Sequence, residues 1–378
     1  MSMARDHSVQ LGALETRGRL RRLIAREGRD FASNDYLALA GDPIIAQAVA
    51  DAIARGVPVG SGGSRLLRGN AVEHESLEAK AAVFFGSEAA LFFSTGFAAN
   101  NAIFASLPQK GDLILADELI HASVHDGLRM SRAEHMLVRH NDVGAFEAAI
   151  RTWRGSGGKG RAWIAFEALY SMDGDMAPVA DFTKLAEAED VWLVIDEAHA
   201  TGVYGPQGKG LATALEGQDN VISLHTCGKG LGVEGALICC PSVIKEYLIN
   251  RARPFIFSTA PSPLMAVAVS AALDRIADGD DLRSRLLALR THADREICDR
   301  FGLPPSSSQI IPVILGEDKR TMQVAGALQA AGFDVRGIRP PTVPRGTARL
   351  RISLTLNIDE SDISALANAM TEALQSAS

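Results

Sequence analysis

The stretch HTCGKGLGVEGA, at residues 225–236, holds one cationic side chain, Lys229, with a glycine on either side. Such an amine could face a phosphate in a nucleotide-binding loop, or it could carry a covalent ligand and move during a reaction. Small neighbours suit the second use, because they leave room for the lysine and for an incoming substrate. Other motifs of the sequence distinguish between these two chemistries.

A nucleotide-hydrolysing loop requires four residues between its first glycine and a Gly-Lys-Ser/Thr sequence. Lys229 and Lys209 are both followed by glycine, so neither loop offers a hydroxyl group for magnesium. The glycine-rich stretch GSGGSRLLRG, at 60–69, follows a helical pattern, which is the wrong context for a dinucleotide-binding turn. These mismatches disfavour a nucleotide-binding module.

A lysine can instead form a Schiff base with pyridoxal phosphate, whose ring withdraws electrons from a carbanion. The ring nitrogen must stay protonated for that purpose, which requires a buried carboxylate. Asp196 closes the apolar run VWLVID, where a strand would bring its last side chain to the ligand-binding edge of a sheet. His199 follows three residues later and could bond the phenolic oxygen of such a cofactor. Taken separately, Asp196 would be interpreted as a helix-capping or turn residue, and His199 as a structural residue.

The phosphate of the cofactor needs backbone amides at the start of a helix, where the helix dipole favours an anion. Thr95, Gly96 and Phe97 stand between a strand pattern and a helical pattern, although an ordinary strand-to-helix turn would look the same. Thr226 precedes Lys229 by three residues and could add a hydroxyl group to the same phosphate.

Two histidines of the stretch IHASVHDG are candidates for contact with the pyridine ring. His121 could stack on the free face of the ring, because its side chain is aromatic and has a polar edge. His125 lies one helical turn further on and is interpreted as a structural or surface residue. No role is assigned to His225.

Short apolar runs alternate with helical patterns through the middle of the chain. The predicted strands cover residues 90–94, 112–117, 163–169, 191–196, 221–226 and 236–240. Helical patterns at 73–85 and 181–190 lie between them. This alternation predicts an α/β fold, in which a mostly parallel sheet has helices on both faces and binds ligands at the carboxyl ends of its strands.

The pattern changes to long helices from about Pro261, and the strand patterns IIPVILG and ARLRISLTL follow before a closing helix. We therefore expect a smaller C-terminal α+β domain. The predicted division is an N-terminal segment, a large cofactor-binding domain and the small domain, over residues 1–45, 46–265 and 266–378.

The composition excludes several classes of protein. The chain has 378 residues, 22% of them charged, and a net charge of −7, which gives no basic surface for nucleic acid or an anionic membrane. The N-terminus lacks the apolar run of a secretory signal, and no window is long enough to span a membrane. Four cysteines form neither a disulfide framework nor a spaced metal site. We expect a cytoplasmic protein with reduced thiols and no metal.

Taken together, these residues resemble the α-oxoamine synthases, fold-type I pyridoxal phosphate enzymes with an aminotransferase-like fold. The likeness extends from FASNDYLALAGDP, at 31–43, to TARLRISLTL, at 347–356. The blocks between them follow in the order of the family, and include GSGGSRLLRG, EHESLE, STGFAANNA, IHASVHDGLRMS, YSMDGDMAPV, VIDEAHATGVYGPQGKG, TCGKGLG and FIFSTAPSP. The resemblance implies a large domain with a mostly parallel sheet of seven strands.

The resemblance also implies a role for each matching residue near the cofactor ring. Lys229 would form the Schiff base, Asp196 would pair with the pyridine nitrogen, and His121 would stack on the ring. The residues on the side of the phenolic oxygen would be His199 and Ser171, with Glu167 nearby.

Further residues would hold the phosphate and the substrate. Thr95, Gly96, Phe97 and Thr226 would bind the phosphate, and Thr259 would reach it from the partner subunit of a homodimer with shared active sites. Asn34 and Arg351 would grip the carboxylate of the amino acid, which suits the planar fork of a guanidinium group. Arg349 projects to the same face of its strand as Arg351, and a surface strand would show the same alternation.

Within the family, GIRPPTVPRGTARLRISLT and TCGKGLGVEGA look like the branch of biotin biosynthesis that condenses L-alanine with a pimeloyl thioester. The acyl carrier would be coenzyme A or an acyl carrier protein. One alternative is the condensation of glycine with succinyl-CoA or acetyl-CoA, as in 5-aminolevulinate synthase and glycine C-acetyltransferase. Another alternative is a non-catalytic partner subunit. The joint presence of the residues that would act on the cofactor disfavours it; these are Lys229, Asp196, His121 and His199.

Several positions depart from the usual family pattern or have an open interpretation. Ala38 stands where glycine is common, and the hydroxyl group of Tyr170 could alter contacts with the acyl chain. Arg65 and Arg68 could reach an acidic acyl donor, but we interpret both as solvated.

Overall fold

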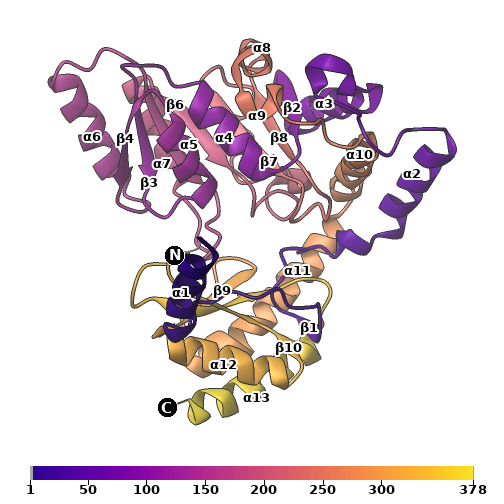
Figure 1. The fold of residues 1–378 in the computed structure, drawn as a ribbon, viewed down its shortest axis with the longest axis vertical. Helices are drawn as coiled ribbons and strands as arrows, with labels where there is room; N and C mark the ends of the chain where they lie inside the picture. The colour runs from indigo at the N-terminus through magenta and orange to yellow at the C-terminus, as the bar shows by residue number, and fades with distance from the viewer. Residues whose placement is uncertain (1–2, 378) are drawn as a thin grey trace. The chain divides into compact units, whose positions relative to one another are not determined.

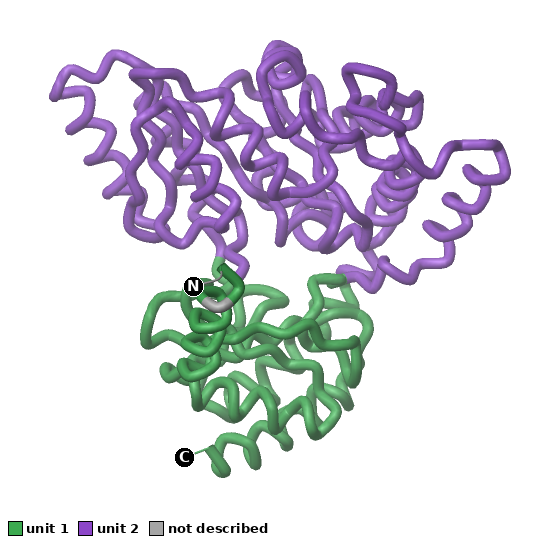
Figure 2. The backbone as a smooth tube through the Cα atoms, in the orientation of Figure 1, with its two compact units in different colours: residues 1–36, 172–175, 284–378 green, residues 37–171, 176–283 purple. Residues whose placement is uncertain are grey.

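The computed structural model describes residues 3–377, which form two compact units (Figure 2). The large unit consists of Leu37–Ser171 and Met176–Arg283. The small unit consists of Met1–Tyr36, Met172–Asp175 and Ser284–Ser378. Among the described residues, no helix is both long and apolar enough to cross a membrane.

A seven-stranded sheet forms the centre of the large unit, in the strand order β2-β8-β7-β6-β5-β3-β4 (Figure 1). β8 runs antiparallel to both of its neighbours, and the other neighbouring pairs are parallel. The strands are β2 (Ala89–Phe93), β3 (Leu113–Asp117), β4 (Glu134–Val138), β5 (Ala162–Glu167), β6 (Trp192–Asp196), β7 (Val221–Thr226) and β8 (Ala236–Cys240). The predicted α/β fold with a mostly parallel sheet is confirmed.

Helices cover both faces of this sheet. The helices of the large unit are α2 (Pro43–Ala54), α3 (Val72–Phe85), α4 (Gly96–Ser106), α5 (Ala122–Met130), α6 (Val143–Gly155), α7 (Val179–Glu189), α8 (Ser242–Arg251), α9 (Arg253–Ile256) and α10 (Pro263–Ala277). Apolar side chains of α4, α5, α8 and α9 form one core with one face of the sheet. Side chains of α6 and α7 form a second core with the opposite face.

The sequence of β5 shows why the sheet is buried on both sides. Successive side chains of a strand point to opposite faces, and Trp163 and Ala165 lie in the first core. Ile164 and Phe166 lie in the second core. A strand buried on both faces is apolar at nearly every position, and β5 therefore carries its first carboxyl group only at its end, at Glu167.

The small unit has an α+β organisation. Its antiparallel sheet has the order β11-β12-β9, and the N-terminal β1 pairs with β10 in a separate two-stranded parallel sheet. The elements are α1 (Met3–Thr16), β1 (Arg29–Asp30), β9 (Ile310–Gly316), α12 (Asp318–Ala330), β10 (Phe333–Asp334), β11 (Arg336–Ile338), β12 (Ala348–Ser353) and α13 (Glu360–Ser376). A further helix, α11 (Asp280–Ala293), contains the point at which the chain passes between the units.

The division into units differs from the sequence-based boundary near residue 265. α10 belongs to the large unit, because it packs against α2 and α3. The N-terminal residues up to Tyr36 belong to the small unit, because β1 pairs with β10. Both differences arise from contacts between segments that are distant in the sequence.

Candidate active site

Four parallel strands of the large unit end in polar residues at the same edge of the sheet. Asp117 ends β3, Glu167 ends β5, Asp196 ends β6 and Thr226 ends β7. Glu167 and Asp196 are partners in the register of β5 and β6, so their backbones are adjacent. Sheets of this kind bind ligands at the carboxyl ends of their strands, and this edge is therefore the candidate active site.

The carboxylate of Asp196 is buried and accepts two hydrogen bonds. Asn100 Nδ2, in α4, donates to Oδ2 over 2.9 Å. The backbone N–H of Ala198 donates to Oδ1 over 3.0 Å. Bonds donated to a carboxylate stabilise its charge, so this arrangement suits the buried anion that the sequence predicts at Asp196.

Glu167 lies beside Asp196 in a different electrostatic state. Burial raises the pKa of Glu167 well above its usual value, and the charge of Asp196 raises it further, whereas Lys229 and the N–H of Ser171 act in the opposite direction. The Ser171 N–H donates to Oε2 over 3.2 Å, and Oε1 has no hydrogen-bond partner among the described residues. Two adjacent carboxyl groups do not ionise together easily. Burial and the neighbouring charge therefore both favour the protonated form of Glu167.

The start of α4 forms a cradle for an anion. Thr95 is the N-cap of this helix, and its Oγ1 accepts the N–H of Ala98 over 3.1 Å. The first amides of a helix, here those of Gly96 and Phe97 among them, have no acceptor within the helix, and the helix dipole attracts negative charge there. A Cβ atom added to Gly96 would lie 2.5 Å from Thr226 Cγ2. Glycine is thus required for the end of β7 to lie this close to the helix start.

His121 lies close enough to Asp196, and Lys229 close enough to Glu167 and His121, for their charges to interact. Desolvation of the ring lowers the pKa of His121, although the residue as a whole is exposed; Asp196 raises this pKa and Lys229 lowers it. The charge of Lys229 also acts on Glu167. The structure therefore brings together four of the residues that the sequence predicts around a cofactor ring.

The two glycines beside Lys229 have different roles. A Cβ atom on Gly230 would lie 2.3 Å from the carbonyl oxygen of Thr201, so Gly230 allows two backbone segments to pack closely. The expectation that it leaves room for a substrate is wrong. Gly228 is exposed, and its nearest neighbour, the carbonyl oxygen of Val233, would lie 3.8 Å from an added Cβ. Gly228 alone provides space beside the lysine.

The other predicted residues of the large unit lie in connecting segments. His199 is buried in the turn after β6, and Ser171 is buried shortly after β5. Thr259 is exposed, and the neighbouring Ala260 donates its N–H to the carbonyl oxygen of Gly63 in the glycine-rich loop over 2.9 Å. The reach of Thr259 into the site of a second copy stays a prediction.

Arg351 and Asn34 meet inside the small unit. Arg351 Nη2 donates to Asn34 Oδ1 over 3.0 Å and to the Tyr36 hydroxyl over 3.3 Å, and Arg351 Nη1 donates to Ser353 Oγ over 2.6 Å. These contacts preorganise the guanidinium group that the sequence predicts as the clamp for the substrate carboxylate, a role that stays a prediction.

The alternation around Arg349 and Arg351 does not belong to a surface strand. β12 is the central strand of its sheet, and the two arginines are 3% and 6% exposed. Arg349 forms an ion pair with Asp173, and its charge is therefore matched within the fold. The surface-strand alternative is wrong, because chain segments distant in sequence cover the polar face.

Three further interpretations can be compared with the structure. The solvated interpretation is wrong for Arg65, whose side chain is 7% exposed and pairs with Glu78 over 2.7 Å, whereas Arg68 is exposed as expected. His125 is half-buried. Tyr170 lies in the core beneath the sheet, which leaves the expected contact of its hydroxyl group with an acyl chain without support.

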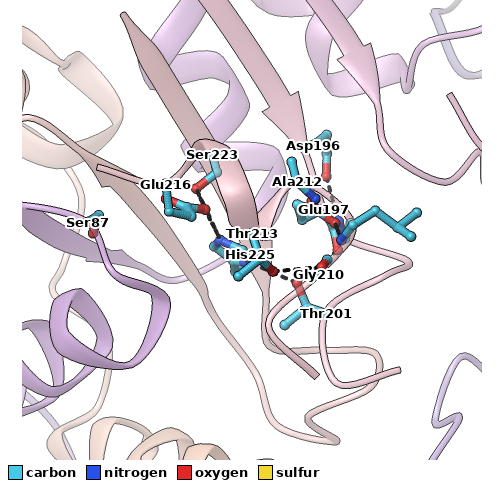
Figure 3. A network of polar contacts seen from close by, with 12 residues as sticks. Ser87, Asp196, Glu197, Thr201, Gly210, Ala212, Thr213, Glu216, Ser223 and His225 are labelled. Atoms are coloured by element: carbon cyan, nitrogen blue, oxygen red, sulfur yellow. Dashed lines mark hydrogen bonds and ion pairs between the residues drawn. The ribbon is translucent and has the colours of Figure 1, made fainter. Parts of the chain in front are cut away.

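His225 belongs to a buried network of polar contacts (Figure 3). Its Nε2 lies 3.1 Å from both Glu216 Oε1 and Ser223 Oγ, and its Nδ1 lies 2.9 Å from Thr201 Oγ1. The ring also stacks on Phe85, with 3.7 Å between the ring centres. These contacts assign His225 a structural role, which the sequence alone left open.

Glu197, next to Asp196, fixes the loop that follows β6 (Figure 3). Its two carboxyl oxygens accept the N–H groups of Leu211 and Ala212. Burial raises the pKa of Glu197 to about 7, against the opposing effect of His225. Sequence reasoning missed this residue, because a second acidic residue after a strand gives no sign that it points away from the ligand edge.

The residues at the sheet edge fit pyridoxal phosphate. Gly96 leaves open a helix start that a Cβ atom would crowd, which suits a phosphate group. Asp196 is a buried carboxylate that suits a protonated ring nitrogen, and Lys229 supplies an amine. Glu167 Oε1 is a buried polar atom without a partner among the described residues, and a bound group with a polar edge would satisfy it.

Comparison with known proteins gives the same result. The family model for aminotransferase class I and II matches residues 26–370. The chain is 41% identical to the 8-amino-7-oxononanoate synthase of Herminiimonas arsenicoxydans over 91% of this chain and 89% of that protein. It is 42% identical to the enzyme of the same name from Burkholderia thailandensis, over 93% and 90%.

Solved structures extend the comparison to the fold. The crystal structure of 8-amino-7-oxononanoate synthase from Francisella tularensis has a TM-score of 0.78 at 28% identity, covering 92% of this chain and 98% of that one. Serine palmitoyltransferase from Sphingomonas wittichii has a TM-score of 0.86 at 26% identity, covering 92% and 87%. The chain therefore belongs to the aminotransferase class I and II family and, within it, to the group of the 8-amino-7-oxononanoate synthases.

Proposed function

We propose that this protein condenses L-alanine with a pimeloyl thioester in a pyridoxal phosphate-dependent reaction of biotin biosynthesis. The products are 8-amino-7-oxononanoate, carbon dioxide and the free thiol. The observation that carries the proposal is the grouping of Lys229, Asp196, His121 and the helix start at Gly96 at one sheet edge. Relatives about 40% identical in sequence carry the name of this synthase and support the choice of substrates.

Pyridoxal phosphate, when bound, supplies an aldehyde that reacts with amines and a ring that withdraws electrons from the α-carbon of an amino acid. Lys229 Nζ would attach it, and Asp196 would accept the hydrogen bond of the protonated ring nitrogen. The helix start at Gly96, with Thr226, would hold the phosphate. His199 and Ser171 would contact the side of the phenolic oxygen, close to Glu167.

Lys229 would also move the substrate proton. As a free amine, its Nζ could remove the α-proton of alanine and return a proton after carbon dioxide leaves.

Arg351 and Asn34 would hold the carboxylate of alanine until it is lost. The guanidinium group makes bonds to Asn34, Tyr36 and Ser353 that fix its orientation, and a fixed fork can form two parallel hydrogen bonds to a carboxylate. Arg349 is less suited to this role, since Asp173 already neutralises it.

The proposal includes a homodimer with shared active sites, in which Thr259 of one copy reaches the phosphate in the other. The exposure of Thr259 in a segment bonded to the glycine-rich loop supports it. We also place the reaction in the cytoplasm, because all four cysteines are buried free thiols, as is usual in a reducing compartment. The acyl group would arrive on coenzyme A or on an acyl carrier protein.

The test is the mass of the product formed from alanine and pimeloyl-CoA or pimeloyl carrier protein. Glycine with succinyl-CoA or acetyl-CoA, and the methyl ester of the pimeloyl thioester, serve as comparison substrates. We expect 8-amino-7-oxononanoate from alanine and the free pimeloyl acid. Turnover only with glycine would replace this proposal by the alternative condensation.

Borohydride treatment and peptide mapping test the attachment of the cofactor. The unsubstituted enzyme should retain a permanent adduct at Lys229, and Lys229→Ala should lose the adduct, the visible absorbance and turnover while it stays folded. An adduct at another lysine, or full turnover by Lys229→Ala, would contradict the proposed role.

A further inference from the structure

A chain of polar contacts links Asp196 to His121 through two residues without an assigned role. Asn100 Nδ2 lies 2.9 Å from Asp196 Oδ2 and 3.0 Å from Ser123 Oγ. Ser123 Oγ lies 2.8 Å from His121 Nδ1. Asn100 is 2% exposed and Ser123 is 0% exposed. The carboxylate and the imidazole are therefore connected inside the protein, on the side away from solvent.

The chemistry of the groups fixes the direction of each hydrogen bond. An ionised carboxylate only accepts, so the amide of Asn100 must present its NH₂ group to Asp196. The same NH₂ group donates to Ser123 Oγ, which leaves the hydroxyl hydrogen of Ser123 available to His121 Nδ1. The backbone N–H of Ser123 also donates to Nδ1, over 3.2 Å. His121 Nδ1 is thus an acceptor, and its ring is neutral with the proton on Nε2.

Packing alone does not explain an asparagine at position 100. Its Oδ1 is buried and has no hydrogen-bond partner among the described residues, and an unsatisfied buried acceptor destabilises a fold. The neighbouring Asn101 has the same unsatisfied acceptor, since its Oδ1 is also buried without a hydrogen-bond partner among the described residues. Asn101 Nδ2, however, donates to the Phe97 carbonyl oxygen and not to Asp196. The two residues form a matched pair in which only Asn100 contacts the carboxylate.

We propose that Asn100 and Ser123 are positioning residues, which hold the Asp196 carboxylate and the His121 ring in one rigid unit with the His121 proton on Nε2. Asn100 fixes the carboxylate oxygen that faces α4, and Ser123 transmits this constraint to the ring. The inference rests on the proposed function, because Asp196 and His121 serve the cofactor only if pyridoxal phosphate binds at this edge.

The first test is the tautomer of His121, measured by ¹⁵N NMR of the full chain labelled at its nine histidines. His121→Gln identifies the signals, and spectra are recorded with and without pyridoxal phosphate. We expect an unprotonated Nδ1 and a protonated Nε2 at neutral pH, and mixed tautomers in Ser123→Ala. A cationic or Nδ1-protonated ring in the unsubstituted protein would overturn the inference, and this outcome does not depend on turnover.

The second test is the affinity for pyridoxal phosphate, measured by absorbance titration. Asn100→Ala should bind it at least about tenfold more weakly, because a hydrogen bond to a charged group is lost. Ser123→Ala should weaken the affinity for pyridoxal phosphate by a smaller factor. The affinity of the double variant should fall by less than the product of the two single factors, since the residues act as one unit. Asn101→Ala should bind pyridoxal phosphate with an affinity within about twofold of that of the unsubstituted protein. Its loss of thermal stability should be similar to that of Asn100→Ala.

The outcomes separate this inference from the function on which it rests. If the unsubstituted protein fails to bind pyridoxal phosphate, the proposed function fails and the inference with it. If the unsubstituted protein and Asn100→Ala bind equally well, or if Asn100→Ala and Asn101→Ala lose affinity equally, only the positioning role is overturned. Should Asn100→Ala not fold, Ser123→Ala and the NMR spectrum of the unsubstituted protein still decide the question.

Discussion

Glu167 and Asp196 end neighbouring parallel strands as register partners, and burial raises the pKa of Glu167 beside a carboxylate that accepts two hydrogen bonds. Two carboxyl groups of the same chemistry thus lie in different environments. The difference depends on burial and on their common edge of the sheet, and it leads to the first prediction.

Glu167→Gln should increase stability at neutral pH in protein prepared without cofactor. The folded state keeps a proton that the unfolded state loses above its pKa of about 4.3. The free energy of unfolding therefore falls as pH rises from there towards the raised pKa of folded Glu167, by up to about 1.4 kcal/mol per pH unit. Glutamine has no proton to lose, so urea unfolding at pH 5 and pH 8 should show a smaller decline.

Glu197→Gln is the control for that experiment. Both oxygens of Glu197 accept backbone N–H groups, and glutamine offers only one accepting oxygen. This variant should be less stable at pH 5, by about 1–3 kcal/mol, and its loss should be smaller at pH 8, because ionisation of Glu197, whose pKa is also raised, lowers the stability of the unsubstituted protein there. An equal loss of stability in Glu167→Gln would show that Glu167 is ionised in the folded protein.

Gly96→Ala should weaken the binding of pyridoxal phosphate, because its Cβ atom would meet Thr226 Cγ2 at 2.5 Å. Removing that methyl group with Thr226→Ser keeps the hydroxyl group and relieves the collision. The double variant should therefore bind the cofactor more tightly than Gly96→Ala alone, as measured by absorbance titration. Absence of this rescue would mean that the close approach of the two residues is not what requires glycine.

Arg351→Lys should raise the KM for alanine by about tenfold or more, since lysine cannot form the paired hydrogen bonds of a guanidinium group. Arg349→Lys is the matched variant on the same strand, and it should lower thermal stability through its contact with Asp173 while the KM for alanine changes little. Steady-state kinetics and thermal unfolding of both variants check this pair. A larger effect on KM from Arg349→Lys would exchange the roles of the two arginines.

Ala38→Gly should stabilise the protein. Ala38 has a left-handed backbone conformation, with φ 55° and ψ 36°, which is unfavourable by about 1–2 kcal/mol for a residue with a Cβ atom. Glycine relieves this strain and restores the residue common in the family, with a net gain of about 1 kcal/mol after its greater entropy loss. Ala50→Gly, on the exposed side of α2, should instead lose about 0.5–1 kcal/mol. Denaturant unfolding compares the two.

A mixture of two inactive or weakened variants tests whether the active sites are shared. Lys229→Ala has no attachment point, and Thr259→Ala would lack the contact from the second copy. If Thr259 acts across a dimer interface, a mixed dimer contains one complete site, and unfolding and refolding the two variants together should restore activity. Activity no greater than that of Thr259→Ala alone would place Thr259 in its own site or outside any site.

The central strands could be predicted because a strand buried on both faces is a continuous apolar run. β7 and β8 cover the predicted residues 221–226 and 236–240. β4 was missing from the prediction because its first four residues are exposed, and Glu134 and His135 interrupt any apolar run. An edge strand of this kind has no apolar pattern to detect.

The site shows the same limit. The residue types at the strand ends could be inferred from motifs, but the raised pKa of Glu167 depends on burial and on the register between β5 and β6, which the sequence does not reveal. The burial of Arg349 could not be predicted either, since its partner Asp173 is distant in the chain. Asn100 gave no signal, because an amide within a helical pattern indicates nothing about a carboxylate 96 residues away.

The pairing of Arg29 with Phe333 and of Asp30 with Asp334 has a consequence for biosynthesis. β1 leaves the ribosome long before its partner strand β10 has been translated. It therefore has to remain unpaired with β10 while the large unit folds on its own; of the chain within that unit, only Met172–Asp175 belongs to the small unit. Nascent chains halted before residue 333 should therefore contain a protease-resistant large unit and an N-terminal segment that is still open to cleavage.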